Sequence, residues 1–177
     1  MPKDKRAFIF YIITSLVLWQ FGISIRDLCI RPDMQIITKD NPFVSFVYLK
    51  NTGGAFSLFN DYTNLLAAFG IIALLAIIIY SYNKLEFDDK YKILTITSLT
   101  AGILGNLAER LAEGYVIDFI KLNFVNFAVF NFFDILISVS IFSLAILIFY
   151  DEFKKRIIEK HNEDATDTAV EQAELLK

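Results

Sequence analysis

The chain has 177 residues, 55% of them hydrophobic, and its mean hydropathy of +0.49 is typical of a membrane protein. The formal net charge is −3, with an acidic surplus after residue 160, and nothing in this pattern indicates a nucleic-acid partner. There is a single cysteine, Cys29, and a single histidine, His161, which lies in the polar tail. This composition excludes an internal disulfide, a thiolate or histidine metal site, and a Ser-His-Asp triad.

Four segments are apolar and long enough to cross a bilayer, which takes roughly 20 residues of helix. They are residues 7–25, 64–82, 93–111 and 129–150. The first is longer than the apolar part of a usual secretory signal and no small-x-small cleavage site follows it, so we interpret it as a retained anchor. We therefore predict an all-α membrane protein with four transmembrane helices.

Lysine and arginine predict the orientation of these spans. Clusters at residues 3–6, 84–92 and 154–156 flank the first, second and fourth spans, and with four spans all of them fall on one side. The excess of positive charge identifies that side as the cytoplasm, although single basic residues also occur on the other side. Both termini are then cytoplasmic, and the segments after the first and third spans lie outside.

The longer outer segment contains a predicted β element, over about residues 27–60. Within it, FVSFVYLK at residues 43–50 is rich in residues that favour strands, and NTGG follows as a turn. Residues 1–160 form one membrane domain in this interpretation. The tail at 161–177 is acidic and has few large apolar residues, which predicts a disordered cytoplasmic segment.

Two carboxylates stand where an acid is costly. Asp134 is the only charged residue between Leu122 and Tyr150, and counting from Val129 puts it roughly 7 to 8 Å inside the last span. An acid at that place usually faces a protein interior and marks a working site, although a helix cap or a partner for an arginine would also explain it. Asp118, sixteen positions earlier, can return beside it. Two adjacent carboxylates share a proton, which suits acid–base chemistry on an amide.

Polar residues nearby could orient these carboxylates or a substrate carbonyl. Asn51, Asn106, Arg110 and Asn131 all supply hydrogen-bond donors, and each also has an ordinary structural role open to it. Asp27 and Arg31 stand four residues apart near the first span, a spacing that allows a helical ion pair, which we interpret as structural.

Three ordered motifs identify a family. NTGGAFS at residues 51–57, GNLAERL followed by GYVIDFI at 105–120, and FNFFD at 130–134 together resemble the lipoprotein signal peptidases, the type II signal peptidases of bacteria. The resemblance implies an inner-membrane aspartic protease that cleaves prolipoproteins just before a diacylglyceryl-modified cysteine, with Asp118 and Asp134 as the catalytic pair. It implies no metal and no cofactor, and it adds a small extracytoplasmic β-cradle and a short periplasmic helix to the four spans.

The resemblance also implies which residues bind the substrate or support the aspartates. These are Asn51, Gly53, Asn106, Arg110, Asn131, Asp27 and Arg31. The implied partners are prolipoproteins, membrane lipid and the inhibitor globomycin, and because the site uses one chain we expect a monomer. The sequence departs from the family pattern at Glu109, usually Asp, at Arg31, usually Lys, and at Phe133, usually a small residue. If Phe133 faces the pocket, it narrows the substrate groove.

Two other functions compete with the protease. In a small proton-coupled transporter or channel subunit the same acids would bind a proton or cation, but such sites are expected near the bilayer midplane at discontinuous helices. An inactive relative would only bind lipoprotein precursors, and Phe133 is the departure that favours it.

Overall fold

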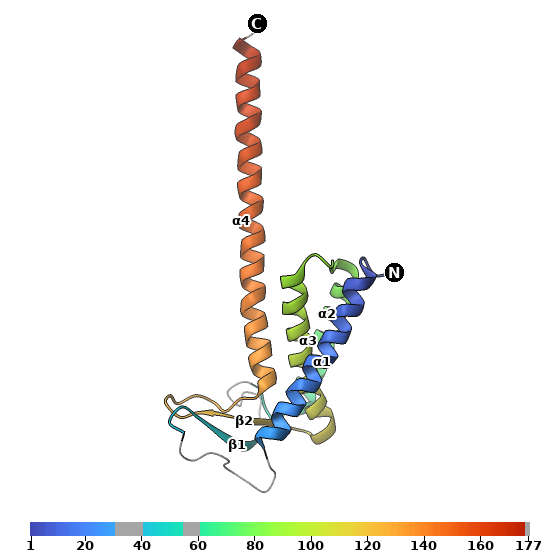
Figure 1. Ribbon diagram of the computed structural model, residues 1–177, viewed down its shortest axis with the longest axis vertical. Helices are drawn as coiled ribbons and strands as arrows, with labels where there is room; N and C mark the ends of the chain where they lie inside the picture. The colour runs from blue at the N-terminus through green and yellow to red at the C-terminus, as the bar shows by residue number, and fades with distance from the viewer. Residues whose placement is uncertain (31–40, 55–60, 176–177) are drawn as a thin grey trace. The chain divides into compact units, whose positions relative to one another are not determined.

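The protein is described by a computed structural model over residues 1–30, 41–54 and 61–175, with side chains up to residue 161 (Figure 1). Its elements are α1 (Lys5–Cys29), β1 (Val44–Asn51), α2 (Thr63–Lys84), α3 (Lys90–Glu113), β2 (Val116–Leu122) and α4 (Phe132–Leu175). The chain divides into two compact units, residues 1–141 and 142–177. All of the contacts discussed below lie within the first unit.

Three of the four predicted spans are confirmed as long apolar helices. Among the described residues, Lys5–Cys29, Thr63–Lys84 and Phe132–His161 are long and apolar enough to cross a membrane. The third predicted span, residues 93–111, is indeed helical as part of α3, but α3 does not reach the same apolarity. The chain is therefore a mostly helical membrane protein in which a fourth spanning helix stays a prediction.

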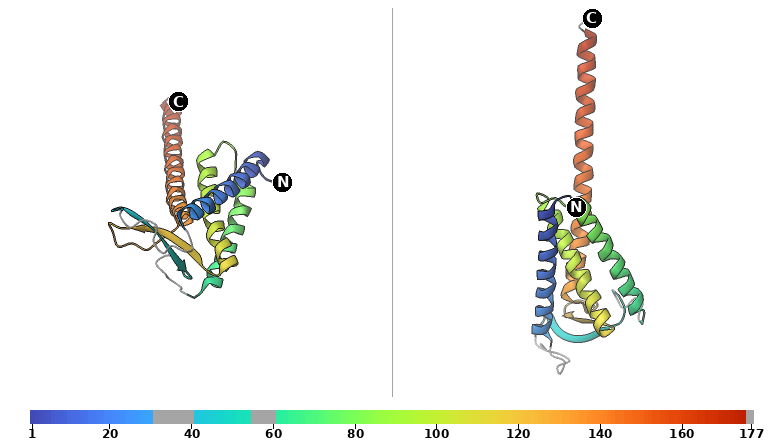
Figure 2. Two further views of the ribbon diagram at one scale, coloured as in Figure 1. Left: turned by 60° about the horizontal axis from the view of Figure 1, so that its bottom comes forward. Right: turned by 90° about the vertical axis from the view of Figure 1, so that its right-hand side faces the viewer.

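The lower hydropathy of α3 has a structural reason. This helix lies against both α1 and α2 (Figure 2) and buries several polar side chains, Thr95, Thr97, Thr100, Asn106 and Glu109. Two of them meet α1, where the hydroxyl of Thr100 lies 3.0 Å from that of Tyr11 and the hydroxyl of Thr97 lies 3.3 Å from that of Thr14. Because these groups face other helices, α3 needs fewer apolar residues than a helix surrounded by lipid.

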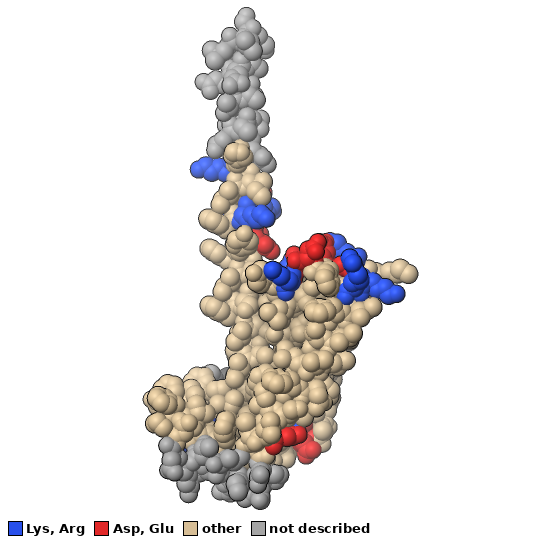
Figure 3. All heavy atoms as spheres, in the orientation of Figure 1, with Lys and Arg blue, Asp and Glu red and all other residues tan. Residues whose placement is uncertain are grey.

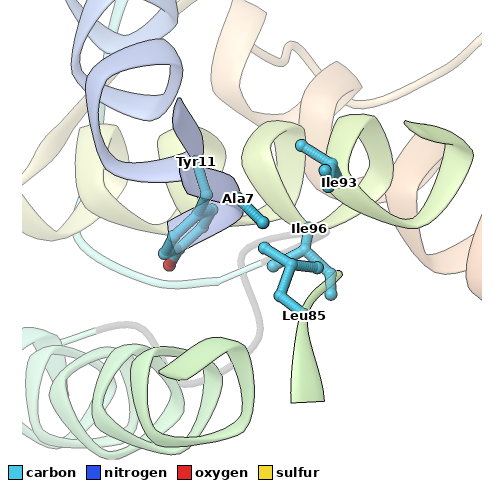
Figure 4. Packing of buried hydrophobic residues seen from close by; sticks show 5 residues of the cluster. All are labelled: Ala7, Tyr11, Leu85, Ile93 and Ile96. Atoms are coloured by element: carbon cyan, nitrogen blue, oxygen red, sulfur yellow. The ribbon is translucent and has the colours of Figure 1, made fainter. Parts of the chain in front are cut away.

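One end of the helix bundle is closed by an apolar cluster and a helix cap. Ala7, Tyr11, Leu85, Ile93 and Ile96 pack together there (Figure 4). The α1 cap, Asp4, accepts hydrogen bonds from the backbone of residues 6 and 7, and its other oxygen accepts one from residue 87 in the α2–α3 loop. The basic clusters at 3–6 and 84–92 meet at this end, where charged side chains gather (Figure 3).

The predicted strand at 43–50 is confirmed as β1, which pairs with β2 in an antiparallel sheet. The register places Asn51 opposite Val116 and Leu49 opposite Asp118, with an irregularity between Phe46 and Leu49. Gly114, at a positive φ of 77°, ends α3 and turns the chain into β2. This turn brings the residues just after α3 back under the helix and sets the position of Asp118.

Two further expectations concern the C-terminal tail and the short outer helix. The tail from residue 161 was expected to be disordered, whereas α4 continues to Leu175. Its segment after residue 160 contains no glycine or proline, and its commonest residues are Ala and Glu, both good helix formers. The short outer helix is not found within residues 41–54 or 114–131, and residues 31–40 and 55–60 lie outside the described part of the chain.

Candidate active site

Asp118 lies in the middle of β2, and its side chain is only 2% exposed. Both carboxylate oxygens accept hydrogen bonds from side-chain amides. Asn51 Nδ2, at the end of β1, donates to Oδ2 at 2.8 Å, and Asn131 Nδ2, just before α4, donates to Oδ1 at 2.9 Å. Asp118 is thus held from two sides by groups that are far from it in sequence.

Asp134 is the third residue of α4, about 3 Å from the helix start and shallower than counting from Val129 suggested. Its Oδ1 accepts a hydrogen bond from Asn106 Nδ2 at 2.8 Å, and its Oδ2 accepts one from the Asn131 backbone at 3.0 Å. In return, Asn131 Oδ1 accepts from the Asp134 backbone at 3.0 Å. This reciprocal pair has the form of a capping box, so Asp134 caps a helix and also belongs to the polar cluster.

Asn131 joins the two aspartates. Its side chain is 1% exposed, and besides bonding Asp118 its Nδ2 donates to Asn106 Oδ1 at 3.0 Å. Its side-chain oxygen and its backbone meanwhile exchange hydrogen bonds with Asp134. One residue therefore bonds both carboxylates, Asp118 through its side-chain amide and Asp134 through its backbone N–H, and this restricts where the two acids lie relative to each other.

The environment of Asp118 shifts its acidity. Burial, together with the nearby negative charge of Asp134, raises the pKa of Asp118 to about 6, against the opposing effect of hydrogen bonds from Asn51 and Asn131. The result is a carboxyl group that titrates near neutral pH. Such a group can hold a proton or take one up during a reaction.

Arg110 ties the NTGG turn to α3. Its Nη2 donates to the Gly53 carbonyl at 2.7 Å and its Nη1 to the Asn106 carbonyl at 3.2 Å. The Asn51 side-chain oxygen accepts from the Gly53 N–H at 2.9 Å, so the turn is held from both ends. The Arg110 guanidinium is attracted by both Asp118 and Asp134, although its described hydrogen bonds go to carbonyls. It therefore adds positive charge to the site and positions Gly53.

Only Asp27 of the predicted pair of Asp27 and Arg31 can be described, because Arg31 lies outside the described residues. Asp27 is bound by its neighbour Arg26, whose Nε and Nη2 lie 2.9 and 2.8 Å from Asp27 Oδ1. The Asp27 side chain is 62% exposed. Its part in substrate binding stays a prediction.

The Phe133 side chain is part of the helix packing. It is 2% exposed, and its ring lies against Gly22 of α1 and Gly105 of α3. A Cβ atom on either glycine would overlap that ring, and one on Gly102 would come within 2.8 Å of the Phe133 carbonyl oxygen. The absence of side chains at Gly22 and Gly105 makes room for the aromatic ring.

Sequence reasoning missed two charged residues near the site. Glu109 was treated only as a departure from the family pattern, and Arg26 is one of the single basic residues on the outer side to which no role was given. They form a salt bridge at 2.7 Å, although 83 positions separate them. No local pattern signals such a pair. Among the described residues, no group of His, Cys, Asp and Glu side chains is arranged to hold a metal ion.

Comparison with known proteins decides the family. The profile of a family described as signal peptidase (SPase) II matches residues 7–165. The chain belongs to the signal peptidase II family. This agrees with the resemblance carried by the three motifs, and Asn51, Asp118 and Asn131, one from each motif, are joined by hydrogen bonds.

Relatives of this signal peptidase II family member are called lipoprotein signal peptidases. The one from Streptococcus pneumoniae is 36% identical over 110 residues, covering 62% of this chain and 71% of the relative. The one from Clostridium tetani is 33% identical over 132 residues, covering 73% and 82%. The one from Fusobacterium nucleatum is 25% identical over 157 residues, covering 87% and 93%.

The fold is also similar to solved structures of bacterial membrane enzymes. One has a TM-score of 0.72 at 22% sequence identity, covering 81% of this chain and 89% of the other. A second has a TM-score of 0.67, also at 22% identity, covering 78% and 92%. Together with the apolar helices, these findings describe a multi-pass membrane protein of the signal peptidase II family.

Proposed function

We propose that this protein removes signal peptides from prolipoproteins as an aspartic endopeptidase, with Asp118 and Asp134 as its catalytic pair. Membership of the signal peptidase II family supports the reaction. The observation that supports the residues is the buried Asn131, whose side-chain amide donates to the Asp118 carboxylate and whose backbone N–H donates to the Asp134 carboxylate. The substrate would be a prolipoprotein with a diacylglyceryl cysteine, cut just before that cysteine.

The chemistry follows from two carboxyl groups that share one proton. One carboxylate takes a proton from a water molecule as the water oxygen attacks the scissile carbonyl carbon, while the protonated partner donates to the carbonyl oxygen. The tetrahedral intermediate then collapses, the C–N bond breaks, and the proton taken from water passes to the leaving nitrogen. The raised pKa of Asp118, about 6, favours this residue as the proton holder in the resting site.

The setting of the pair fits a lipid-bearing substrate. Asp134 lies in the first turn of an apolar helix and Asp118 on a strand outside the helices, so the scissile bond would be held at the membrane surface. Acyl chains kept in the outer leaflet would supply binding energy far from that bond. The family resemblance adds an inner-membrane location, sensitivity to globomycin and one chain per active site, and the positive charge pattern adds cytoplasmic termini with the site on the outer face.

The competing functions lose their specific support. The inactive-relative hypothesis rested on Phe133, whose ring is buried between glycines of α1 and α3. The transporter hypothesis expected acids at discontinuous helices, whereas Asp118 is a strand residue.

The test is cleavage of a purified diacylglyceryl-modified prolipoprotein, followed by gel shift, with the parent protein, Asp118→Asn and Asp134→Asn. We expect the parent to cleave before the lipidated cysteine, globomycin to block it, and both variants to lose at least about 10³-fold in rate, as loss of an essential acid or base does. Asp61→Asn is the matched control, because Asp61 is exposed and its positive φ of 68° suits asparagine. Cleavage by either dyad variant at the parent's rate would refute the residue assignment.

A further inference from the structure

Glu109 is a buried acid that the proposed reaction does not use. It lies on α3, is 6% exposed, and has no described bond to either aspartate. Its two oxygens are both occupied: Oε1 accepts from Arg26 Nη1 of α1 at 2.7 Å, and Oε2 accepts from the Ile117 backbone N–H of β2 at 2.7 Å. One carboxylate thus connects three elements of the fold.

The contact with β2 falls next to the catalytic strand residue. Ile117 immediately precedes Asp118, and its N–H donates to Glu109. On the other side of Asp118, the N–H groups of Phe119 and Ile120 donate to the Phe130 carbonyl at 3.1 and 2.8 Å. The backbone is therefore anchored directly before and directly after Asp118, once by a side chain and once by the segment that leads into α4.

We propose that Glu109 is a positioning residue for catalysis, which fixes the backbone of β2 so that the Asp118 carboxylate stays aimed at the reacting bond. Arg26 supports this role, because its guanidinium neutralises the buried Glu109 carboxylate and holds the Glu109 side chain in one rotamer. Asp27 in turn accepts two hydrogen bonds from Arg26. This inference rests on the proposed role of Asp118, but it adds Glu109 and Arg26, which the family's catalytic pair does not include.

The chemistry of the contact explains why a carboxylate is needed at position 109. A carboxylate offers an acceptor oxygen to each partner, whereas glutamine offers one acceptor and would turn an N–H towards the other donor. Alanine would leave Arg26 Nη1 without its acceptor, although Asp27 would still bind the guanidinium, and would leave the Ile117 N–H without an acceptor. Either change would free the backbone before Asp118, while Asn51 and Asn131 would still hold the carboxylate loosely.

The experiment compares Glu109→Gln and Glu109→Ala with the parent in steady-state cleavage of the lipidated prolipoprotein. We expect kcat to fall by about 10- to 100-fold with KM within about twofold, since misplacing a catalytic group by about 1 Å costs on that order and the substrate's lipid is bound elsewhere. The control is Glu113→Gln, one turn further along α3, where the side chain is exposed. Its kcat should equal that of the parent.

A second measurement does not depend on activity. Hydrogen exchange of the Ile117 amide, followed by mass spectrometry in detergent, should quicken at least about tenfold in Glu109→Gln and not in Glu113→Gln. Parent-like kcat in a folded Glu109→Gln, an equal loss in Glu113→Gln, or unchanged Ile117 exchange would each overturn the inference. If the parent itself fails to cleave the prolipoprotein, the proposed function fails, and the exchange measurement still decides whether Glu109 holds β2.

Discussion

Replacing Phe133 by alanine separates two views of this residue. If the ring lined the substrate groove, its removal would leave stability unchanged and widen the range of substrates. In the structure the ring is 2% exposed and fills a space bounded by Gly22 and Gly105. Neither glycine has a side chain that could swing into the void, so we expect Phe133→Ala to leave a cavity between α1, α3 and α4.

The size of the effect can be worked out. Phe→Ala substitutions in water-soluble cores cost about 3 to 5 kcal/mol, part of which is transfer from water. Between membrane helices the transfer part falls away, because lipid is as apolar as the core. The remaining cavity of roughly 100 Å³, at about 24 cal/mol per Å³, gives about 2.4 kcal/mol of lost unfolding free energy. Cleavage should fall as well, since Phe133 adjoins Asp134.

The measurement is unfolding by SDS titration in mixed micelles, followed by the fluorescence of Trp19, the only tryptophan. Phe69→Ala is the matched control, because Phe69 lies on α2 with 60% of its surface exposed, and it should cost less than about 0.5 kcal/mol. The reasoning would be refuted if Phe133→Ala were as stable as Phe69→Ala and cleaved bulkier substrates faster than the parent.

Three further predictions follow from the same contacts. Gly105→Ala should destabilise the protein by about 1 to 3 kcal/mol in the same titration, because the added Cβ would overlap the Phe133 ring. Gly70→Ala is the control and should be neutral, since the nearest atom to its added Cβ would be at 3.5 Å. Equal stability of the two variants would contradict this prediction. Asn131→Ala should lower kcat at least about 10²-fold, since it removes the bridge between the aspartates, and parent-like kcat would argue against that bridge. Because burial raises the pKa of Asp118 to about 6, the free enzyme loses the shared proton as pH rises through that value, so kcat/KM should fall above about pH 6. In Asn131→Ala the loss of a hydrogen bond that lowers this pKa should move the fall to higher pH, and a pH-independent kcat/KM would sink the shared-proton mechanism.

Local sequence determined the parts of this protein that depend on composition and short-range order. Three apolar helices, the strand at 43–50 and the cost of an acid at Asp134 could all be predicted, because hydropathy and periodicity act within one segment. The order of the motifs also predicted that Asp118 and Asp134 would share one site.

Tertiary structure decided the rest, since it depends on which distant residues meet. The polarity of α3 makes sense only once α1 and α2 cover it, and Phe133 could be assigned to helix packing only when Gly22 and Gly105 were found around it. The joint contact of Asn131 with both aspartates spans β2, α3 and α4. Arg26 and Glu109 pair across 83 positions, a contact that no local pattern encodes because it is created only when the helices assemble.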